Sequence, residues 1–188
     1  MTFAAGSTQP EDAQLAPANA SSLLERARGG DARAFAGLVE THYGFIFATA
    51  FKWCGNRPDA EDVAQDVCLK LGEAIRSFDA RSGFTTWLYR VTLNAVRDLQ
   101  RAQSRTARHA SAYALVSPDE DPGDQEANVA VVDLWRAVRA LPPKQRDAVL
   151  LVYAEELSHA EAAVILECRE ATVSWHVHEA RKTLRGLL

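Results

Sequence analysis

The sequence predicts an all-α fold of two small helical domains joined by a flexible acidic linker, the second domain being a helix-turn-helix. Apolar residues recur every three or four positions through most of the 188-residue chain, which is the spacing that places side chains on one face of a helix. No segment alternates apolar and polar residues as a half-buried strand does. Between 102 and 125 the helical spacing is lost and acidic residues gather, which indicates a linker.

Four segments can be told apart on this basis. Residues 1–20 are small, polar and acidic, without the basic and apolar parts of a signal peptide, and we expect them to be a disordered leader. A first helical domain is expected over 21–102, a linker over 103–127 and a second helical domain over 128–188. Hydrophobic residues make up 47% of the chain, which is enough for a real core in each domain.

The first domain is expected to contain a long core helix near its start. The apolar and aromatic positions of this helix follow a three-four repeat for more than three turns: Phe35, Leu38, Val39, His42, Tyr43, Ile46, Phe47 and Ala50. Gly55-Asn56-Arg57-Pro58 ends it. A new helix begins near Asp59, where acidic side chains favour the positive end of the helix dipole.

The helix that begins at Asp59 has two unlike faces. Val63, Val67 and Leu71 form an apolar face, and polar residues crowd the rest: Asp59, Glu61, Asp62, Gln65 and Asp66. These polar residues are either a solvated surface or a docking face for a basic partner. They do not indicate acid–base catalysis, because no nucleophile, glycine-rich phosphate loop or histidine partner accompanies them.

A third helix is expected over 84–101, after a loop at 77–83. Its apolar stripe comprises Leu88, Val91, Ala95 and Leu99. The same helix carries aromatic, amide and guanidinium groups: Trp87, Tyr89, Arg90, Asn94, Arg97 and Arg101. Aromatic rings stack on unpaired bases and arginines hold the backbone, a combination used to bind single strands. The alternative is that the aromatic rings belong to the core and the arginines are solvated.

In the second domain, Leu141-Pro142-Pro143 separates an earlier helix from one expected over 145–154. Two short helices then follow over 158–184, joined by a turn at 167–170. Ser158 and Glu161 form a capping box at the start of the first of them. The second helix buries a stripe at four-three-four spacing: Val173, Val177, Ala180 and Leu184.

The remaining candidate residues of this segment lie away from the stripe or on its margins, except for Arg169, which lies in the turn. They are Arg169, Thr172, Ser174, Trp175, His176, Glu179, Arg181 and Lys182. This is how a helix-turn-helix offers a recognition helix to the major groove of DNA. A plain helical hairpin is the alternative.

Charge is strongly segregated along the chain, although the net charge is only −4. Residues 88–109 hold five arginines and one acid, whereas 119–126 hold five acids and no base. A basic stripe can bind phosphates despite an acidic total, because salt screens distant exposed charges. No run of 18 apolar residues exists, so we expect no membrane span.

The cysteines and histidines do not indicate a metal or cofactor. Cys54, Cys68 and Cys168 are odd in number and far apart, which argues against a disulfide framework and against a zinc site. Buried free thiols in a reducing cytoplasm are the expected state. His176 and His178 are two residues apart on a helix and therefore diverge.

Four segments in order carry a family resemblance: DAEDVAQDVCLKL, FTTWLYRVTLNAVRDLQR, LPPKQRDAVLLVYAEELSHAEAAVIL and ATVSWHVHEARKTL. Together they resemble the extracytoplasmic-function sigma factors of bacterial RNA polymerase, over roughly 21–102 and 130–188. The resemblance implies a cytoplasmic promoter-specificity subunit without catalytic activity. Its implied partners are core RNA polymerase, promoter DNA and an anti-sigma factor.

The resemblance also implies roles for the candidate residues. The acidic helix would dock on the polymerase clamp through Asp59, Glu61, Asp62, Gln65 and Asp66. The loop at 78–84 and the following helix would read and melt the downstream promoter element with Phe78, Phe84, Trp87, Arg90, Asn94, Arg97 and Arg101. In such readers a base swings out of the stack into a protein pocket. The second domain would bind the polymerase flap and read the upstream element, and the acidic linker would lie near the RNA path.

The recognition helix departs from the pattern of this family. Ser174, His176 and Glu179 stand where relatives typically carry basic residues. Each lost phosphate contact removes counterion release, so we expect weaker or different upstream binding. Trp175 is expected to pack on a sugar or a thymine methyl group, or to contact a protein.

Two other functions remain open at this level. A two-domain response regulator would have a similar terminal helix-turn-helix, but its first domain would show alternating strands and an acidic phosphoacceptor pocket. A helical interaction protein that mimics a sigma factor would share the acidic helix and lack DNA affinity. An enzyme is disfavoured, because no catalytic site assembles.

Overall fold

The computed structural model describes residues 17–110 and 129–187, and within these ranges it contains helices and no strand. The helices are α1 (Pro17–Arg28), α2 (Ala32–Cys54), α3 (Arg57–Ala74), a 3-10 turn (Ile75–Ser77), α4 (Phe84–Ala110), α5 (Val129–Ala140), α6 (Pro143–Val149), a π-helical segment (Leu150–Ala154), α7 (His159–Leu166) and α8 (Glu170–Leu187). The all-α prediction is confirmed. Most of the linker expected from the sequence lies outside the described residues.

Local signals explain where the helices of the first domain begin and end. The Asp31 carboxylate caps α2 by accepting from the amides of Arg33 and Ala34 at 2.9 and 3.1 Å. The Asn56 side chain caps α3 by accepting from the Asp59 amide at 2.9 Å. Between these helices, Gly55 ends α2 in the left-handed region with φ of 78°, a conformation that glycine adopts without strain.

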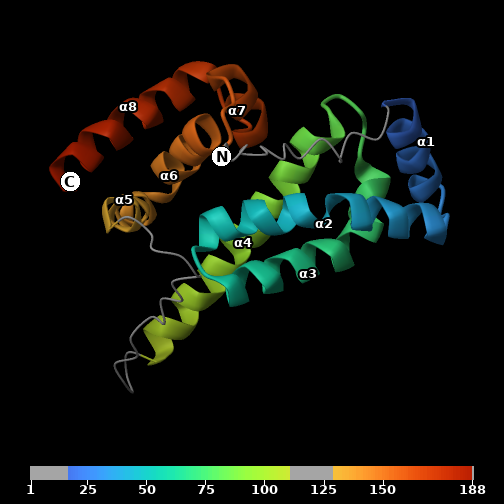
Figure 1. Ribbon diagram of the computed structural model, residues 1–188, viewed down its shortest axis with the longest axis horizontal. Coiled ribbons are helices and arrows are strands. Elements are labelled where there is room, and N and C mark those ends of the chain that lie inside the picture. The colour runs from blue at the N-terminus through green and yellow to red at the C-terminus, as the bar shows by residue number, and fades with distance from the viewer. Residues whose placement is uncertain (1–16, 111–128, 188) are drawn as a thin grey trace, which may run out of the picture.

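Helices α1 to α4 form the first domain, in which α2 packs against α1, α3 and α4 (Figure 1). The predicted apolar face of α3 is fully buried, with Val63, Val67 and Leu71 in the core. Helices α5 to α8 form the second domain, where α8 rests on α6 and α7 through Val173, Val177 and Ala180. These are three of the four stripe residues expected from the sequence, and Leu184 is partly buried beside them.

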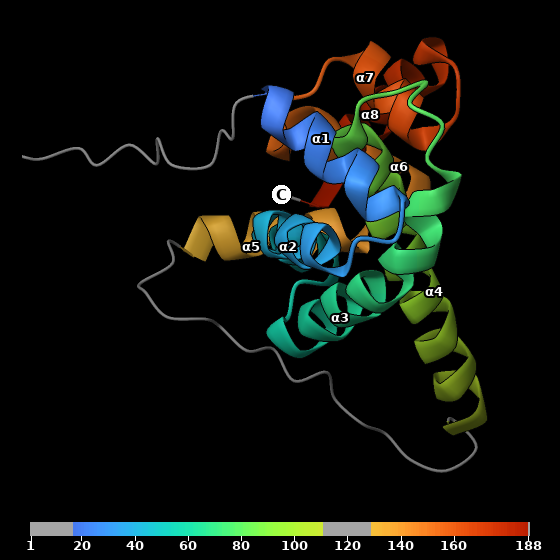
Figure 2. The ribbon, with the colours of Figure 1, turned by 90° about the vertical axis from the view of Figure 1, so that its right-hand side faces the viewer.

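The two domains pack against each other instead of standing apart. In Figure 1 the second domain lies alongside α2 and the first part of α4. One continuous cluster of buried residues includes Trp53 and Leu88 from the first domain and Leu150 and Leu151 from the second. Figure 2 shows the C-terminal part of α4 projecting away from the other helices.

Two helices extend past the segment limits expected from the sequence. Residues 17–20 were assigned to the leader, but they form the first turn of α1. Helix α4 continues to Ala110, so that 103–110 are helical and not part of a linker. Alanine, glutamine and arginine in this stretch are strong helix formers, and Gln103 donates to both carboxylate oxygens of Asp59 at 3.0 Å.

The buried stripe of α4 also differs from the predicted one. Leu88, Leu93 and Val96 are its fully buried apolar residues, whereas Val91, Ala95 and Leu99 are only partly buried. The helix is covered on two sides, by α2 and α3 within its own domain and by α7 of the second domain. A single repeat of three and four cannot describe a helix that is buried on more than one face.

Gly55 offers a test of the connection between α2 and α3. A Cβ atom at this position would lie 2.7 Å from Cδ and Nη1 of Arg139, in addition to the strain of a left-handed backbone. We expect Gly55→Ala to lower the free energy of unfolding by about 1–2 kcal/mol. Gly44→Ala is the matched control, because Gly44 lies inside α2 with no atom within 4 Å of its Cβ position. The control should be neutral or stabilising by up to about 1 kcal/mol. Equal urea midpoints for the two variants would contradict this account.

Candidate nucleic-acid interface

The acidic face of α3 contains one free acid and one exposed leucine. Asp59 is held by Asn56 and Gln103, Glu61 pairs with Arg57 at 2.7 Å and Asp66 pairs with Lys70 at 2.7 Å. Among the described residues Asp62 has no such partner. Leu69 on the same helix is 82% exposed.

Asp62, Gln65 and Leu69 follow one another at three- and four-residue spacing and therefore share one side of the helix. The outer side of α3 thus combines a free carboxylate, an amide and an apolar side chain. Such a mixture is more typical of a protein-binding surface than of a surface that faces only water.

An aromatic cluster stands at the start of α4 and in the loop before it. The rings of Phe78, Phe84 and Trp87 lie with centroids 5.5–5.6 Å apart, and His42 packs edge-on against Phe84 at 5.1 Å. Trp87 is only 7% exposed and Phe78 is buried. These two rings therefore serve the core and support the loop at 79–83, and Phe84 is the most accessible ring of the three.

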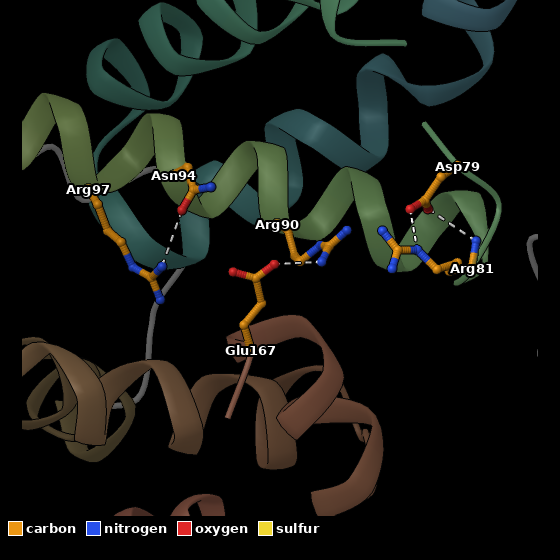
Figure 3. A network of polar contacts seen from close by, with 6 residues as sticks. All are labelled: Asp79, Arg81, Arg90, Asn94, Arg97 and Glu167. Carbon is orange, nitrogen blue, oxygen red and sulfur yellow. Dashed lines mark hydrogen bonds and ion pairs between the residues drawn. The ribbon is translucent and has the colours of Figure 1, made fainter. Parts of the chain in front are cut away.

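Beyond the aromatic cluster, α4 carries a row of polar side chains on the side that faces the second domain (Figure 3). Arg90 pairs with Glu167 at 2.7 Å, and the Asn94 Oδ1 atom accepts from Arg97 Nη1 at 3.3 Å. Arg101 pairs with Asp98 at 3.0 Å and donates to the Arg97 carbonyl. The structure thus brings Arg90, Asn94 and Arg97 together on one face, where Asn94 remains exposed.

Asp147 on α6 forms the most buried polar contact between the domains. Its side chain is 4% exposed and accepts from Trp53 Nε1 at 2.8 Å and from Arg97 Nη2 at 2.7 Å. Next to it, Arg146 donates to the Gln100 side chain at 2.7 Å. A carboxylate taken out of water is tolerated only when such donors surround it.

Glu155 makes a second contact of the same kind. Its carboxylate accepts from Lys52 Nζ at 2.7 Å and from the Tyr89 hydroxyl at 2.6 Å. Burial is the main cause that raises the pKa of Tyr89, and the hydrogen bond to Glu155 is the second. The phenol therefore stays protonated and donates to Glu155.

A cavity of about 960 Å³ lies beside these contacts, between α4 and the second domain. Its cationic lining residues outnumber its acids: Arg97, Arg101, Arg105, Lys144 and Arg146 against Asp147 and Glu167. Thr172 and His176 of α8 reach the same cavity. Desolvation and, after it, the nearby Lys144 charge lower the pKa of His176, which keeps this imidazole neutral near pH 7.

The helix-turn-helix has the geometry that its sequence predicts. Both bonds of the Ser158–Glu161 capping box are present. The Ser158 hydroxyl and, as the smaller cause, the Ser158 amide donate to the Glu161 carboxylate and hold its pKa below the usual value. Glu167 ends α7 in the left-handed region with φ of 52°, and α8 begins at Glu170. The predicted turn is therefore confirmed at 167–169, and Glu170, which was also assigned to it, is the first residue of α8.

The predicted recognition residues are not equally available on α8. Trp175 is 56% exposed, and Arg181 and Lys182 are exposed as well, as is Arg169 in the turn. The Ser174 hydroxyl contacts His159 Nδ1 of α7 at 2.8 Å, and Glu179 is half-buried. Ser174, Thr172 and His176 therefore lie on the inner margins of the helix.

His178, a residue beyond the predicted set, shares the outermost face of α8. His178 and Arg185 follow Trp175 and Lys182 at three-residue spacing, and both are exposed. Arg185 is one of the residues from which the sequence predicts phosphate contacts, and the spacing alone would have identified His178. The sequence analysis also did not select Asp147 and Glu155 as functional residues. The signal that could have identified them is that these two acids flank the apolar run at 148–152.

The other candidate chemistry finds no support in the described residues. Burial raises the pKa of the Cys54 thiol to about 12 and also raises that of Cys68, so neither is a reactive thiolate near pH 7. Within 17–110 and 129–187 no group of three or more histidine, cysteine, aspartate or glutamate side chains is arranged so that it could hold a metal ion. In the same ranges no helix has the length and hydropathy needed to cross a membrane.

Comparison with known families gives two matches that together span more than half of the chain. Residues 38–106 match the family model of sigma-70 region 2, and residues 132–184 match that of sigma-70 region 4. The first match ends within α4, and the second covers most of α5 to α8.

Individual relatives agree with these matches over most of their length. The chain is 29% identical to the sigma factor SigW of Bacillus subtilis, over 88% of this chain and 94% of SigW. It is 27% identical to the sigma-E factor of Escherichia coli K12, over 86% of this chain and 90% of that protein. It is 31% identical to SigE of Mycolicibacterium smegmatis, covering 80% of this chain and 60% of SigE.

Solved structures show the same architecture. The sigma factor RpoE of Bartonella quintana, solved with the anti-sigma factor NepR, superposes with a TM-score of 0.65 at 25% identity, over 81% of this chain and 95% of RpoE. CnrH, solved with the cytosolic domain of CnrY, gives a TM-score of 0.63 at 27% identity, over 88% of this chain and 94% of CnrH. A response regulator is excluded, since the first domain is helical throughout its described residues and matches sigma-70 region 2.

Proposed function

The chain belongs to the extracytoplasmic-function sigma factors of the sigma-70 family, and from this premise we propose how its helices divide the work of promoter recognition. As a sigma factor it directs promoter-specific transcription by RNA polymerase, and it is not an enzyme. In our proposal α3 docks on the polymerase clamp, α4 reads and melts the downstream promoter element, and α8 reads the upstream element. The protein then works in the cytoplasm, where its polymerase and DNA partners are.

The observation that carries the proposal is the polar row on α4. Arg90, Asn94 and Arg97 gather on one face of a helix that begins with an aromatic cluster, in the domain that matches sigma-70 region 2. Guanidinium groups bind phosphates with paired, charge-assisted hydrogen bonds, and an exposed amide can read a base edge. Of the aromatic candidates, Phe84 is the ring that we assign to stacking, and Trp87 and Phe78 support it from the core.

The proposed docking face on α3 consists of Asp62, Gln65, Asp66 and Leu69. Its support is the free carboxylate of Asp62 beside the exposed Leu69 side chain. Asp59, Glu61 and Asp66 are held by bonds within the chain, so we assign them a weaker part in docking than Asp62.

For upstream recognition we propose the outer face of α8, with Trp175, Arg181 and Lys182 as its main predicted contacts and with His178 added. The amides at the start of α8, near Arg169, would approach a phosphate. Thr172, Ser174 and His176 have a lesser part, because their side chains lie toward α7 or the interdomain cavity.

An anti-sigma factor is a further proposed partner. The support is that RpoE and CnrH, the two similar structures, were solved in complexes with NepR, an anti-sigma factor, and with CnrY.

The docking assignment predicts the effect of reversing charge on α3. Asp62→Lys with Asp66→Lys should weaken binding to core polymerase by tenfold or more, roughly the effect of removing paired interface charges. Glu25→Lys with Glu40→Lys is a charge-matched control on exposed positions of α1 and α2 and should bind like the native chain. Pull-down and fluorescence titration with purified core polymerase measure this, with circular dichroism as the check of folding. Native-like binding of the α3 variant would remove the docking role.

The reading role of α4 predicts a defect in melting and not in assembly. Asn94→Ala should slow open-complex formation about tenfold while leaving core binding unchanged, since one lost base contact is worth about 1–3 kcal/mol. Asn94 makes only a 3.3 Å contact with Arg97, so the change should not disturb the fold. Asp98→Ala, one turn along the same helix, is the control. Permanganate reactivity of promoter thymines reports melting, and native reactivity in the Asn94 variant would refute its role.

The recognition helix predicts a shallow salt dependence of upstream binding. Residues 170–184 carry two bases and two acids, so α8 offers few phosphate contacts. Glu179→Arg should strengthen binding to an upstream-element duplex by roughly 1 kcal/mol and steepen the log–log salt slope by about one unit. Asp133→Arg on α5 makes the same change of charge away from α8 and should leave the slope unaltered. If Glu179→Arg gives the native affinity and slope, then Glu179 faces away from DNA.

A further inference from the structure

We propose that the cavity between α4 and the second domain is a binding site for a small diphosphate-bearing anion, of the chemical class of the nucleoside diphosphates. Side chains of α4, α6, α8 and the turn after α7 surround this one cavity. The inference goes beyond the proposed division of promoter recognition among the helices and does not depend on it. It gives the chain a small-molecule ligand in addition to its macromolecular partners.

The cationic side chains of the cavity are only partly matched by acids. Asp147 and Glu167 are its two carboxylates, and both are already engaged, by Arg97 and by Arg90, each at 2.7 Å. Three further lining cations pair with no acid among the described residues: Arg105, Lys144 and Arg146. A phosphate group carries about −1.5 to −2 near pH 7. Two phosphates therefore match these cations better than one.

Arg146 is the clearest sign that the cavity takes an anion. The residue is 9% exposed, and the side-chain acceptor that it has is the neutral Gln100, 2.7 Å from Nη2. Its Nε atom is buried without an acceptor. A cation taken out of water is costly unless an anion lies beside it, and the adjacent Asp147 is turned to Arg97 and Trp53. An anion in the cavity supplies the charge that Arg146 lacks.

A second unpartnered atom belongs to α8. His176 also lines the cavity, and its Nδ1 atom is buried with no hydrogen-bond partner. The ring is neutral near pH 7, so it can offer a ligand a donor or an acceptor without adding charge. Buried polar atoms in native proteins nearly always have a partner. Two orphaned atoms on residues that line one cavity therefore indicate a ligand site.

The size and the walls of the cavity suit an organic diphosphate better than a bare ion. Its volume of about 960 Å³ lies at the upper end of the range of about 300–1,000 Å³ that small-molecule sites occupy. Pro143 and Leu166 add apolar surface to the lining, and Ser104 and Thr172 add hydroxyls that bond to no other described residue. A nucleoside diphosphate combines the matching parts, which are a flat ring, hydroxyls and a charged end.

A ligand in this cavity touches both domains at once. Asn94 and Arg97, which also line it, lie on the side of α4 that faces the second domain (Figure 3). Lys144 and Arg146 approach from α6. Because such a ligand binds the folded chain and not the unfolded one, it raises the unfolding temperature by mass action.

The test uses the full-length chain and two charge-matched double variants. The cavity variant, Arg105→Gln with Lys144→Gln, removes two exposed cations that line the cavity. The control, Arg28→Gln with Arg33→Gln, removes two exposed cations from α1 and α2. Isothermal titration calorimetry measures the binding of adenosine and guanosine 5′-diphosphates, inorganic pyrophosphate, adenosine and a random single-stranded DNA pool. Differential scanning fluorimetry measures the unfolding temperature.

We expect one nucleoside diphosphate to bind per chain, more tightly than pyrophosphate, and adenosine not to bind. The cavity variant should bind the nucleotide about tenfold more weakly, because each lost cation removes a charge-assisted contact with a phosphate. The nucleotide should raise the unfolding temperature of the native chain and of the control, and much less that of the cavity variant. Without ligand, all three chains should unfold at similar temperatures.

Three results would overturn the proposal. Equal weakening in the cavity variant and the control would mean that general charge attraction, and no built site, holds the nucleotide. Tighter binding of pyrophosphate than of either nucleotide would mean that the nucleoside does not fit. If neither nucleotide binds and the cavity variant loses affinity for single-stranded DNA, then Arg105 and Lys144 belong to the DNA-binding surface. The roles proposed for α3, α4 and α8 stand or fall separately, by the polymerase-binding, melting and salt-dependence measurements.

Discussion

The bridge from the Asp147 carboxylate to Trp53 and Arg97 determines how the two halves of this protein meet. The two halves share one cluster of buried apolar residues, but apolar packing is not directional and does not by itself fix a single mutual orientation. A buried carboxylate does so, because it tolerates only an arrangement in which donors reach both of its oxygens. Lys52, Tyr89 and Arg90 then find Glu155 and Glu167 within hydrogen-bond distance.

This contact leaves α4 with two unlike faces. Its inner face, with Leu88, Leu93 and Val96, is part of the core of the first domain. Its polar face supplies the arginines and the amide that suit a nucleic-acid strand, and the second domain occupies part of that face.

The second domain shows how one sequence combines a reliable scaffold with an unusual surface. The capping box, the left-handed residue at Glu167 and the buried face of α8 are all features that hold a helix-turn-helix in shape. The outer face of α8 is less basic than the family pattern, with Trp175 as its most prominent side chain. Shape and affinity are thus separable here, because the buried residues hold the helix in position and the exposed ones determine what it binds.

Much of the fold and part of the candidate site could be read from the sequence alone. Helix positions, the buried face of α3, the capping box and the turn at 167–170 depend on residues within a few positions of one another, which is why periodicity and capping rules find them. The order of the motifs likewise identified the family. The sequence also placed the arginines on α4 and the acids on α3, but it could not show that Asp59 and Glu61 are already engaged within the chain.

What the tertiary structure alone decided depends on contacts between distant residues. Arg97 and Asp147 are 50 positions apart, and Tyr89 and Glu155 are 66 apart, so no local pattern announces that they meet. The core placement of Trp87, the extension of α4 to Ala110 and the inward position of Ser174 and His176 follow from what packs beside them. The sequence by itself determined which helices form and which family they belong to. Packing decided which polar side chains remain free, because burial and pairing arise only when the helices come together.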